Sequence, residues 1–107
     1  MIKKIRILGI APYKGLVTLM KQCALQYPEI EFTAYAGSME QGLALAKRYS
    51  EHYDVIISRA NTAKMISQSV HIPVIDIGIG YYDVLRCIKM AQNTGTKFAL
   101  LGFQSLT

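Results

Sequence analysis

Short apolar runs alternate along the chain with segments whose apolar residues recur every three or four positions. Runs of this length are typical of buried strands, and the other spacing is that of amphipathic helices. Chains with this alternation fold into a parallel sheet with helices on both faces. The predicted strands are residues 5–10, 31–35, 54–58, 73–77 and 97–103.

Helices are predicted in the segments between the strands. Pro28 should stop the first helix, and Gly95 should stop the fourth. Ser38 with Gln41 has the spacing of a capping box at the start of the second helix. The apolar faces of the four helices span residues 16–27, 39–49, 62–70 and 84–91.

Right-handed crossovers restrict how these elements connect. We expect an α/β fold: a three-layer, doubly wound, parallel five-stranded sheet with the flavodoxin-like order 2-1-3-4-5. The 107 residues suit one domain. No helix is expected after residue 103 to cover a sheet face, which suggests that the chain is a piece of a larger protein. The uncovered apolar strand 97–103 should then pair between two copies in a homodimer.

Composition excludes several classes of protein. Hydrophobic residues make up 51% of the chain and charged residues 18%, so a packed core is expected and disorder is not. No apolar run reaches the roughly 18 residues that cross a membrane. The N-terminal apolar run is too short for an export signal, so we expect a cytoplasmic protein without a membrane partner.

The basic charge does not indicate a nucleic-acid partner. The net charge is +5, but the basic residues are spread along the chain and do not alternate with aromatic residues. Cys23 and Cys87 lie far apart within predicted helices, match no metal or redox spacing, and should be buried. We therefore expect neither a metal nor direct nucleic-acid contact.

No catalytic constellation is evident. His52 and His71 precede the third and fourth strands, which places them at the end of the sheet away from the usual sites. The sequence has no Walker P-loop and no Gly-x-Gly-x-x-Gly motif. We expect a protein that is not an enzyme and needs no cofactor.

The predicted binding site lies at the carboxyl ends of the strands, where open α/β sheets hold ligands at the reversal of strand order. The loops at that point are residues 11–14 and 58–62. Asn61 or Thr62 should cap the third helix. A helix N-terminus beside the Arg59 guanidinium, with Lys14 nearby, favours an anion.

Four segments, "IAPYKGL", "YDVIISRANTAKMI", "IPVIDI" and "YYDVLRCI", resemble the N-terminal sensor domain of propionate-catabolism activators of the PrpR type. The resemblance runs from about residue 8 to residue 103. It implies the sensory part of a sigma-54-dependent transcription activator that also has an AAA+ ATPase and a helix-turn-helix. It further implies two similar lobes, as in periplasmic binding proteins. Residues 1–107 would form the first lobe, and residues 97–107 would lead into the second.

The resemblance also extends to single residues of the predicted site. Ser58, Arg59 and Thr62 match the family's SRGGT pattern, with Ala60 and Asn61 in place of the two glycines. Tyr82 and Asp83 match its SGYD segment, with Gly80-Tyr81 in place of Ser-Gly, and residues 12–14 match its first loop. The effector is expected to be a small carboxylate-like anion, not necessarily the propionate-derived tricarboxylate linked with the family. The expected ligand-binding residues are Pro12, Tyr13, Lys14, Ser58, Arg59, Asn61, Thr62, Tyr82 and Asp83.

Two alternatives to a sensor domain stay open. A flavodoxin-like receiver or phosphotransfer domain needs an acidic cluster and a phosphorylatable Asp at the strand tips, and the first and third tips lack acids. A plain dimerisation module would associate tightly without any effect of a ligand.

Overall fold

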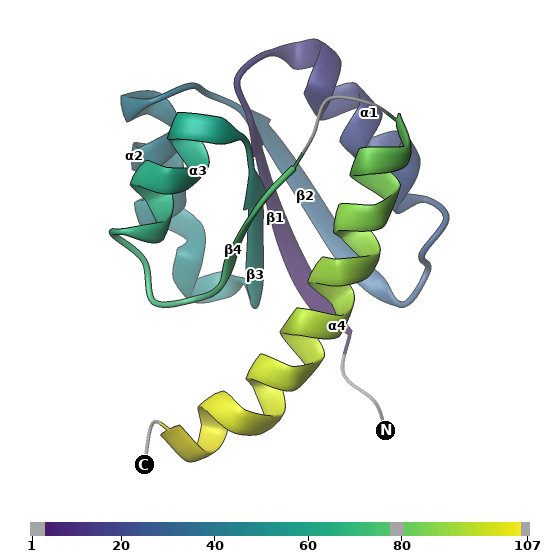
Figure 1. Ribbon diagram of the computed structural model, residues 1–107, viewed down its shortest axis with the longest axis vertical. Helices are drawn as coiled ribbons and strands as arrows, with labels where there is room; N and C mark the ends of the chain where they lie inside the picture. Colours follow the sequence, from purple (N-terminus) through teal and green to yellow (C-terminus); the bar gives the residue numbers. More distant parts are fainter. Residues whose placement is uncertain (1–3, 78–80, 106–107) are drawn as a thin grey trace.

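A computed structural model describes residues 4–77 and 81–105, and for Tyr81, Tyr82 and residues 96–105 it describes the backbone alone. Strands and α-helices alternate through this part of the chain (Figure 1). The elements are β1 (Ile5–Ala11), α1 (Lys14–Ala24), β2 (Ile30–Ala36), α2 (Glu40–Tyr49), the 3-10 turn η1 (Ser50–His52), β3 (Val55–Ser58), α3 (Ala60–Ser67), β4 (Val74–Asp76) and α4 (Tyr81–Ser105).

The strands form one parallel sheet in the order β2-β1-β3-β4. Ile7 of β1 lies opposite Phe32 of β2 on one side and Val55 of β3 on the other. This order confirms the 2-1-3-4 part of the predicted topology. It places the reversal of strand order between β1 and β3, as expected.

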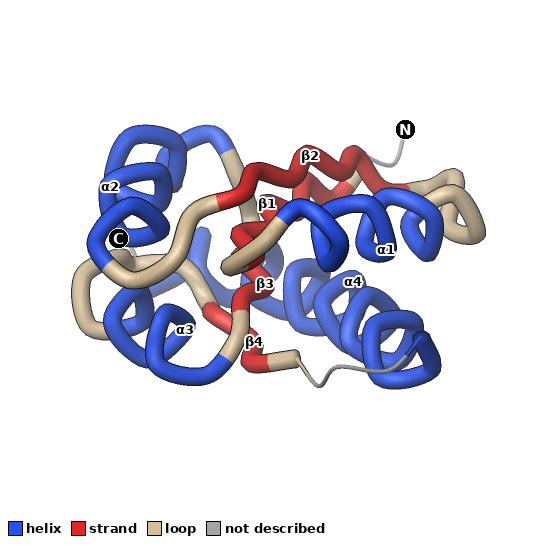
Figure 2. Tube along the Cα trace, turned by 90° about the horizontal axis from the view of Figure 1, so that it is seen from above, coloured by secondary structure: helices blue, strands red, loops and turns tan. Residues whose placement is uncertain are grey.

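Helices cover both faces of the sheet, so the predicted three layers are present. Helices α1 and α4 lie on one face and α2 and α3 on the other (Figure 2). Successive side chains of a strand point to opposite faces. Ile7 therefore packs in the core with Leu16 of α1, whereas Leu8 packs with Ala46 of α2 and Ile66 of α3.

The prediction of a fifth strand is wrong, because residues 97–103 lie within helix α4. Gly95 is not a stop signal. It is a buried helical residue, and a Cβ atom there would lie 2.6 Å from Ile5 Cγ2 and 3.0 Å from Val55 Cγ2. The glycine lets α4 approach β1 and β3 closely, and the helix continues past it.

Helix α4 covers the sheet face that was expected to lack a helix after residue 103. Four residues of α4 pack in the same core as the buried residues of α1: Val84, Cys87, Ile88 and Ala91. The expected homodimer through strand 97–103 therefore loses its structural basis, since that segment is a helix.

The expected burial of the two cysteines and the expected place of the two histidines are confirmed in the described part of the chain. Cys23 and Cys87 are buried, and burial raises the pKa of the Cys23 thiol. His52 and His71 lie before β3 and β4 and are exposed. Among the described residues, no helix is long and apolar enough to span a bilayer, and no three His, Cys, Asp or Glu side chains cluster around a possible metal position.

Candidate functional site

The loops that follow the strands are tied together at the carboxyl edge of the sheet. Gly37, after β2, donates its N–H to the carbonyl of Ala11 at 2.7 Å. Ile77, after β4, donates to the carbonyl of Ser58 at 2.8 Å. These backbone bonds fix where each connecting loop leaves its strand, so the edge is a defined surface.

A pocket of about 230 Å³ opens at this edge between the loops that follow β1, β2 and β3. It brings together four of the nine residues predicted from the sequence. The lining residues are Pro12, Ser38, Met39, Arg59, Ala60, Asn61 and Thr62.

Two hydroxyl groups predicted to bind ligand make bonds within the protein. Ser58 is fully buried, and its Oγ donates to the carbonyl of Ile10 at 2.7 Å. Thr62 is 4% exposed, and its Oγ1 accepts the N–H of Met39 at 2.9 Å. Ser58 thus joins β3 to β1, and Thr62 joins the start of α3 to the start of α2.

Arg59 remains the cation of the pocket. It is the extended residue directly before α3, with φ −139° and ψ 135°, and it is half-buried. Within residues 4–77 and 81–105, no ion pair involves its guanidinium. A half-buried guanidinium that lacks an internal carboxylate can offer its donors to an anion.

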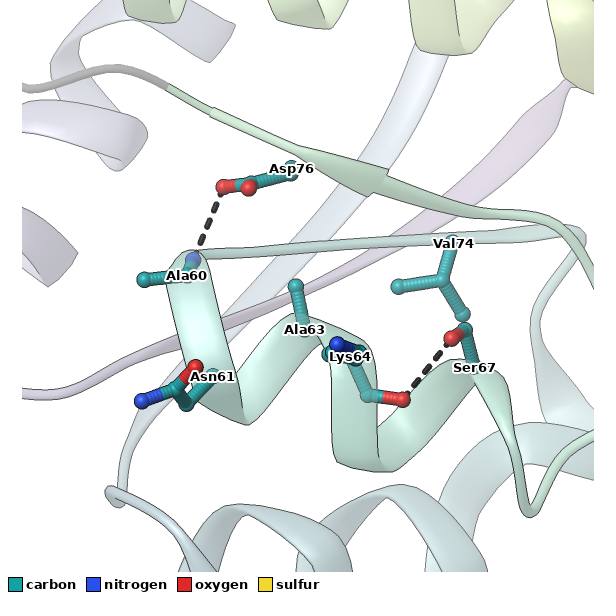
Figure 3. A pocket seen from close by; sticks show the side chains of 7 residues that line it. All are labelled: Ala60, Asn61, Ala63, Lys64, Ser67, Val74 and Asp76. Atoms are coloured by element: carbon teal, nitrogen blue, oxygen red, sulfur yellow. Dashed lines mark hydrogen bonds between the residues drawn. The ribbon is translucent and has the colours of Figure 1, made fainter.

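The N-terminus of α3 is capped from another strand. The N–H of Ala60 donates to Asp76 Oδ1 at 2.8 Å, and Figure 3 shows this bond reaching across from the end of β4. No side chain of the helix's own N-cap residue takes part, so the expectation that Asn61 or Thr62 caps α3 is wrong. A carboxylate is favourable at this position because it faces the positive end of the helix dipole.

A second pocket, of about 390 Å³, lies on the other side of the first turn of α3, between that helix and β4 (Figure 3). Asp76 lies at its rim and makes no ion pair with Arg59. This pocket was not predicted from the sequence, although the acidic residue Asp76 in "PVIDI" marked the strand tip. Its lining residues are Ala60, Asn61, Ala63, Lys64, Ser67, Val74 and Asp76.

Three other predicted site residues, Tyr13, Lys14 and Asp83, lie at the same edge and line neither pocket. Tyr13 and Lys14 are exposed at the start of α1, where no side chain caps the helix. Asp83 lies in the first turn of α4 and pairs with Arg86 at 3.3 Å. Tyr82 lies in the same turn, and its side chain is outside the described part of the structure.

Comparison with known proteins identifies the family. Residues 26–107 match the family model described as propionate catabolism activator, PrpR_N. The chain belongs to this family. The match confirms the resemblance seen in the sequence. A search of curated proteins gives no significant match.

A transcriptional regulator of known structure has a similar fold. It is the crystal structure of an NtrC family transcriptional regulator from Clostridium acetobutylicum, with 27% identity and a TM-score of 0.64. The alignment covers 86% of this chain and 49% of that chain, so this PrpR_N chain spans about half the length of the Clostridium protein.

The pocket of this PrpR_N chain is bordered by two strained residues. Met39 has φ 52° and Ala60 has φ 53°, which is the region that favours glycine. Met39 also has ψ −119°, the geometry of the first central residue of a type II′ turn, and Gln41 N donates to Ser38 O at 3.1 Å. The predicted Ser38–Gln41 capping box is therefore wrong. A tight turn precedes α2, and α2 begins without a side-chain cap.

The geometry at Ala60 explains why the family's sequence pattern has a glycine at this position. A side chain at positive φ costs of order 1–2 kcal/mol, which glycine avoids. We expect Ala60→Gly to stabilise the chain by about 0.5–1 kcal/mol, because the relieved strain exceeds the added entropy of the unfolded chain. Urea unfolding monitored by circular dichroism measures the change. Ala63→Gly is the control, since Ala63 has negative φ and its replacement should lower stability instead.

Proposed function

We propose that the chain is the ligand-sensing regulatory domain of a sigma-54-dependent transcription activator, and that a small carboxylate anion binds beside Arg59. Membership in the propionate catabolism activator family and the likeness to an NtrC family regulator support a regulatory role rather than a catalytic one. The observation that carries the ligand proposal is the half-buried Arg59, which makes no ion pair with any described residue and lines a pocket at the reversal of strand order.

The chemistry of the pocket favours an anion over a neutral ligand. Ser58 and Thr62 hold the loop, so the Arg59 guanidinium is presented from a rigid support. Two fixed N–H donors of Arg59 match one carboxylate. Lys14, at the start of α1 on the same edge, adds a second positive charge. Asp76 already faces the first N–H of α3, so the ligand contacts the guanidinium more than the helix end.

A single lobe supplies one wall of the site. Competent pockets bury 70–90% of a small ligand, whereas this pocket is open on one side. We propose that a second lobe supplies the facing wall, in line with the Clostridium protein, of which this chain spans about half the length. The ligand would favour the closed arrangement because it touches both lobes. The closed arrangement would in turn act on the AAA+ ATPase and the DNA-binding part of the activator.

The receiver-type alternative has less support. Phosphorylation of a receiver needs acidic residues grouped at the tips of the central strands. β1 ends at Ala11 and β3 at Ser58, and the acid at the β4 tip, Asp76, is engaged by Ala60. A sensor that binds its effector without covalent chemistry accounts for the same edge more simply.

Titration with propionate, succinate and citrate, which carry one, two and three carboxylates, tests the proposal. Because one wall contributes, we expect a Kd of about 1 mM, which two-dimensional NMR measures readily. The amide signals of Tyr13, Lys14 and residues 59–62 should shift most. In Arg59→Ala, the loss of a charge-assisted hydrogen bond should weaken binding roughly tenfold, or about 1.5 kcal/mol.

Lys47→Ala is the matched control, since Lys47 is an exposed cation on α2 outside the pocket. It should leave both the affinity and the set of shifted signals unchanged. Arg59→Ala should also keep the wild-type unfolding free energy within about 0.5 kcal/mol. Equal affinity in Arg59→Ala and wild type, or no binding of any of the three carboxylates, would contradict the proposal.

A further inference from the structure

Strand β2 forms an open edge of the sheet. It pairs with β1 alone in the described part of the chain, and no helix lies outside it (Figure 2). Its sequence, IEFTAYA, has no proline and one charged residue, Glu31. Native proteins usually block such edges with prolines, lysines or bulges. A regular seven-residue edge is therefore available to pair with another strand.

Two grooves flank this edge. One has about 440 Å³ and lies on the α1 side of the strand, where Leu25 is 83% exposed beside Phe32. The other has about 400 Å³ and lies on the α2 side, between Ala36 and Arg48. Apolar surface on both sides of an open strand is what a partner sheet with its own helices would cover.

Charge on the α2 side identifies the partner. The guanidinium of Arg48 lies 5.5 Å from the ring centre of Tyr49, which stacks on Tyr35 at 5.1 Å. Glu31 and Tyr35 are four residues apart on β2, so their side chains are on the same face. Neither Arg48 nor Glu31 takes part in an ion pair among the residues that the structure describes.

A second copy of the chain satisfies both groups. Antiparallel pairing of β2 with itself uses all seven residues only when the two-fold axis passes through Thr33. Residue Glu31 then lies directly opposite the partner's Tyr35, whose ring is stacked beneath the partner's Tyr49 and Arg48. The two-fold symmetry repeats this approach, so one register brings Glu31 of each copy toward the Arg48 side of its partner, where two equivalent ion pairs can form.

We propose that β2 is a self-association edge, through which two copies of the chain join antiparallel into one continuous sheet with Glu31 paired to the partner's Arg48. Leu25 and Phe32 become covered on the opposite face of the same strand. The proposal does not depend on ligand binding at Arg59, because the β2 edge lies outside that pocket.

Sedimentation equilibrium over a series of protein concentrations measures dimerisation, and variants that exchange the charges of Glu31 and Arg48 test whether it uses the β2 edge. Glu31→Arg and Arg48→Glu should each weaken dimerisation roughly tenfold or more, since each places like charges opposite one another. The double variant with both exchanges restores opposite charges and should recover wild-type affinity within about threefold. Both residues are exposed, so the fold should survive each exchange.

Glu51→Arg is the control for net charge, because Glu51 is an exposed residue of η1 and lines neither groove. It should leave dimerisation unchanged. Hydrogen exchange gives the second readout: alternate amides of β2 should become protected as concentration rises. A chain that stays monomeric at every concentration would overturn the proposal. A dimer in which the double exchange fails to rescue the single ones would overturn it as well.

Discussion

Gly95→Val should lower the unfolding free energy by about 3 kcal/mol, because the new side chain has no space between α4 and the sheet. The Cβ atom alone would lie 2.6 Å from Ile5 Cγ2 and 3.0 Å from Val55 Cγ2. Val55 is fully buried, so one of the two contacts cannot relax outward. The chain has no tryptophan, so urea unfolding followed by far-ultraviolet circular dichroism measures the loss.

Asn93→Val provides the matched control on the same helix. Asn93 is exposed, so this change has the helix cost of a β-branched residue without any clash, and it should stay within about 0.5 kcal/mol of wild type. Equal stability of the two variants would mean that α4 does not pack on β1 and β3 at residue 95. That result would favour the turn that the sequence predicted there.

The misread helix end shows which kind of information the sequence lacks. Strands 5–10, 31–35, 54–58 and 73–77 were predicted correctly because buried apolar runs record local burial. Gly95 is ambiguous, since the same residue ends a helix or allows two elements to approach closely. The positions of Ile5 and Val55, both far earlier in the chain, distinguish the two, and no local pattern contains them.

For the candidate site too, one part was predictable from the sequence and another part was not. Its location at the strand tips followed from the predicted strand order, and the pocket beside Arg59 lies there. Its internal bonds did not follow, because Asp76 caps α3 from a different strand and Thr62 binds Met39 across 23 residues. Caps predicted from neighbouring residues alone miss partners that tertiary structure supplies.

The bond between Thr62 and Met39 makes the second large prediction. Thr62→Val keeps the shape of the side chain but removes the oxygen that accepts the Met39 N–H at 2.9 Å. The partly buried N–H would then lack a partner, which costs about 2 kcal/mol. The loss falls on a turn whose φ of 52° is already strained, so the start of α2 should loosen first. Hydrogen exchange of residues 38–43 would report that local opening.

Thr62→Ser separates the hydroxyl from the methyl group. Serine keeps the acceptor and loses one methyl, worth about 0.8 kcal/mol of burial, so it should be more stable than the valine variant. If serine proves the less stable of the two, the methyl packing near Gly42 dominates and the hydrogen bond contributes little. The expected order instead implies that Thr62 holds two loops of the pocket together. Carboxylate binding at Arg59 should then weaken in Thr62→Val even if the ligand never touches the hydroxyl, because the pocket loses its support.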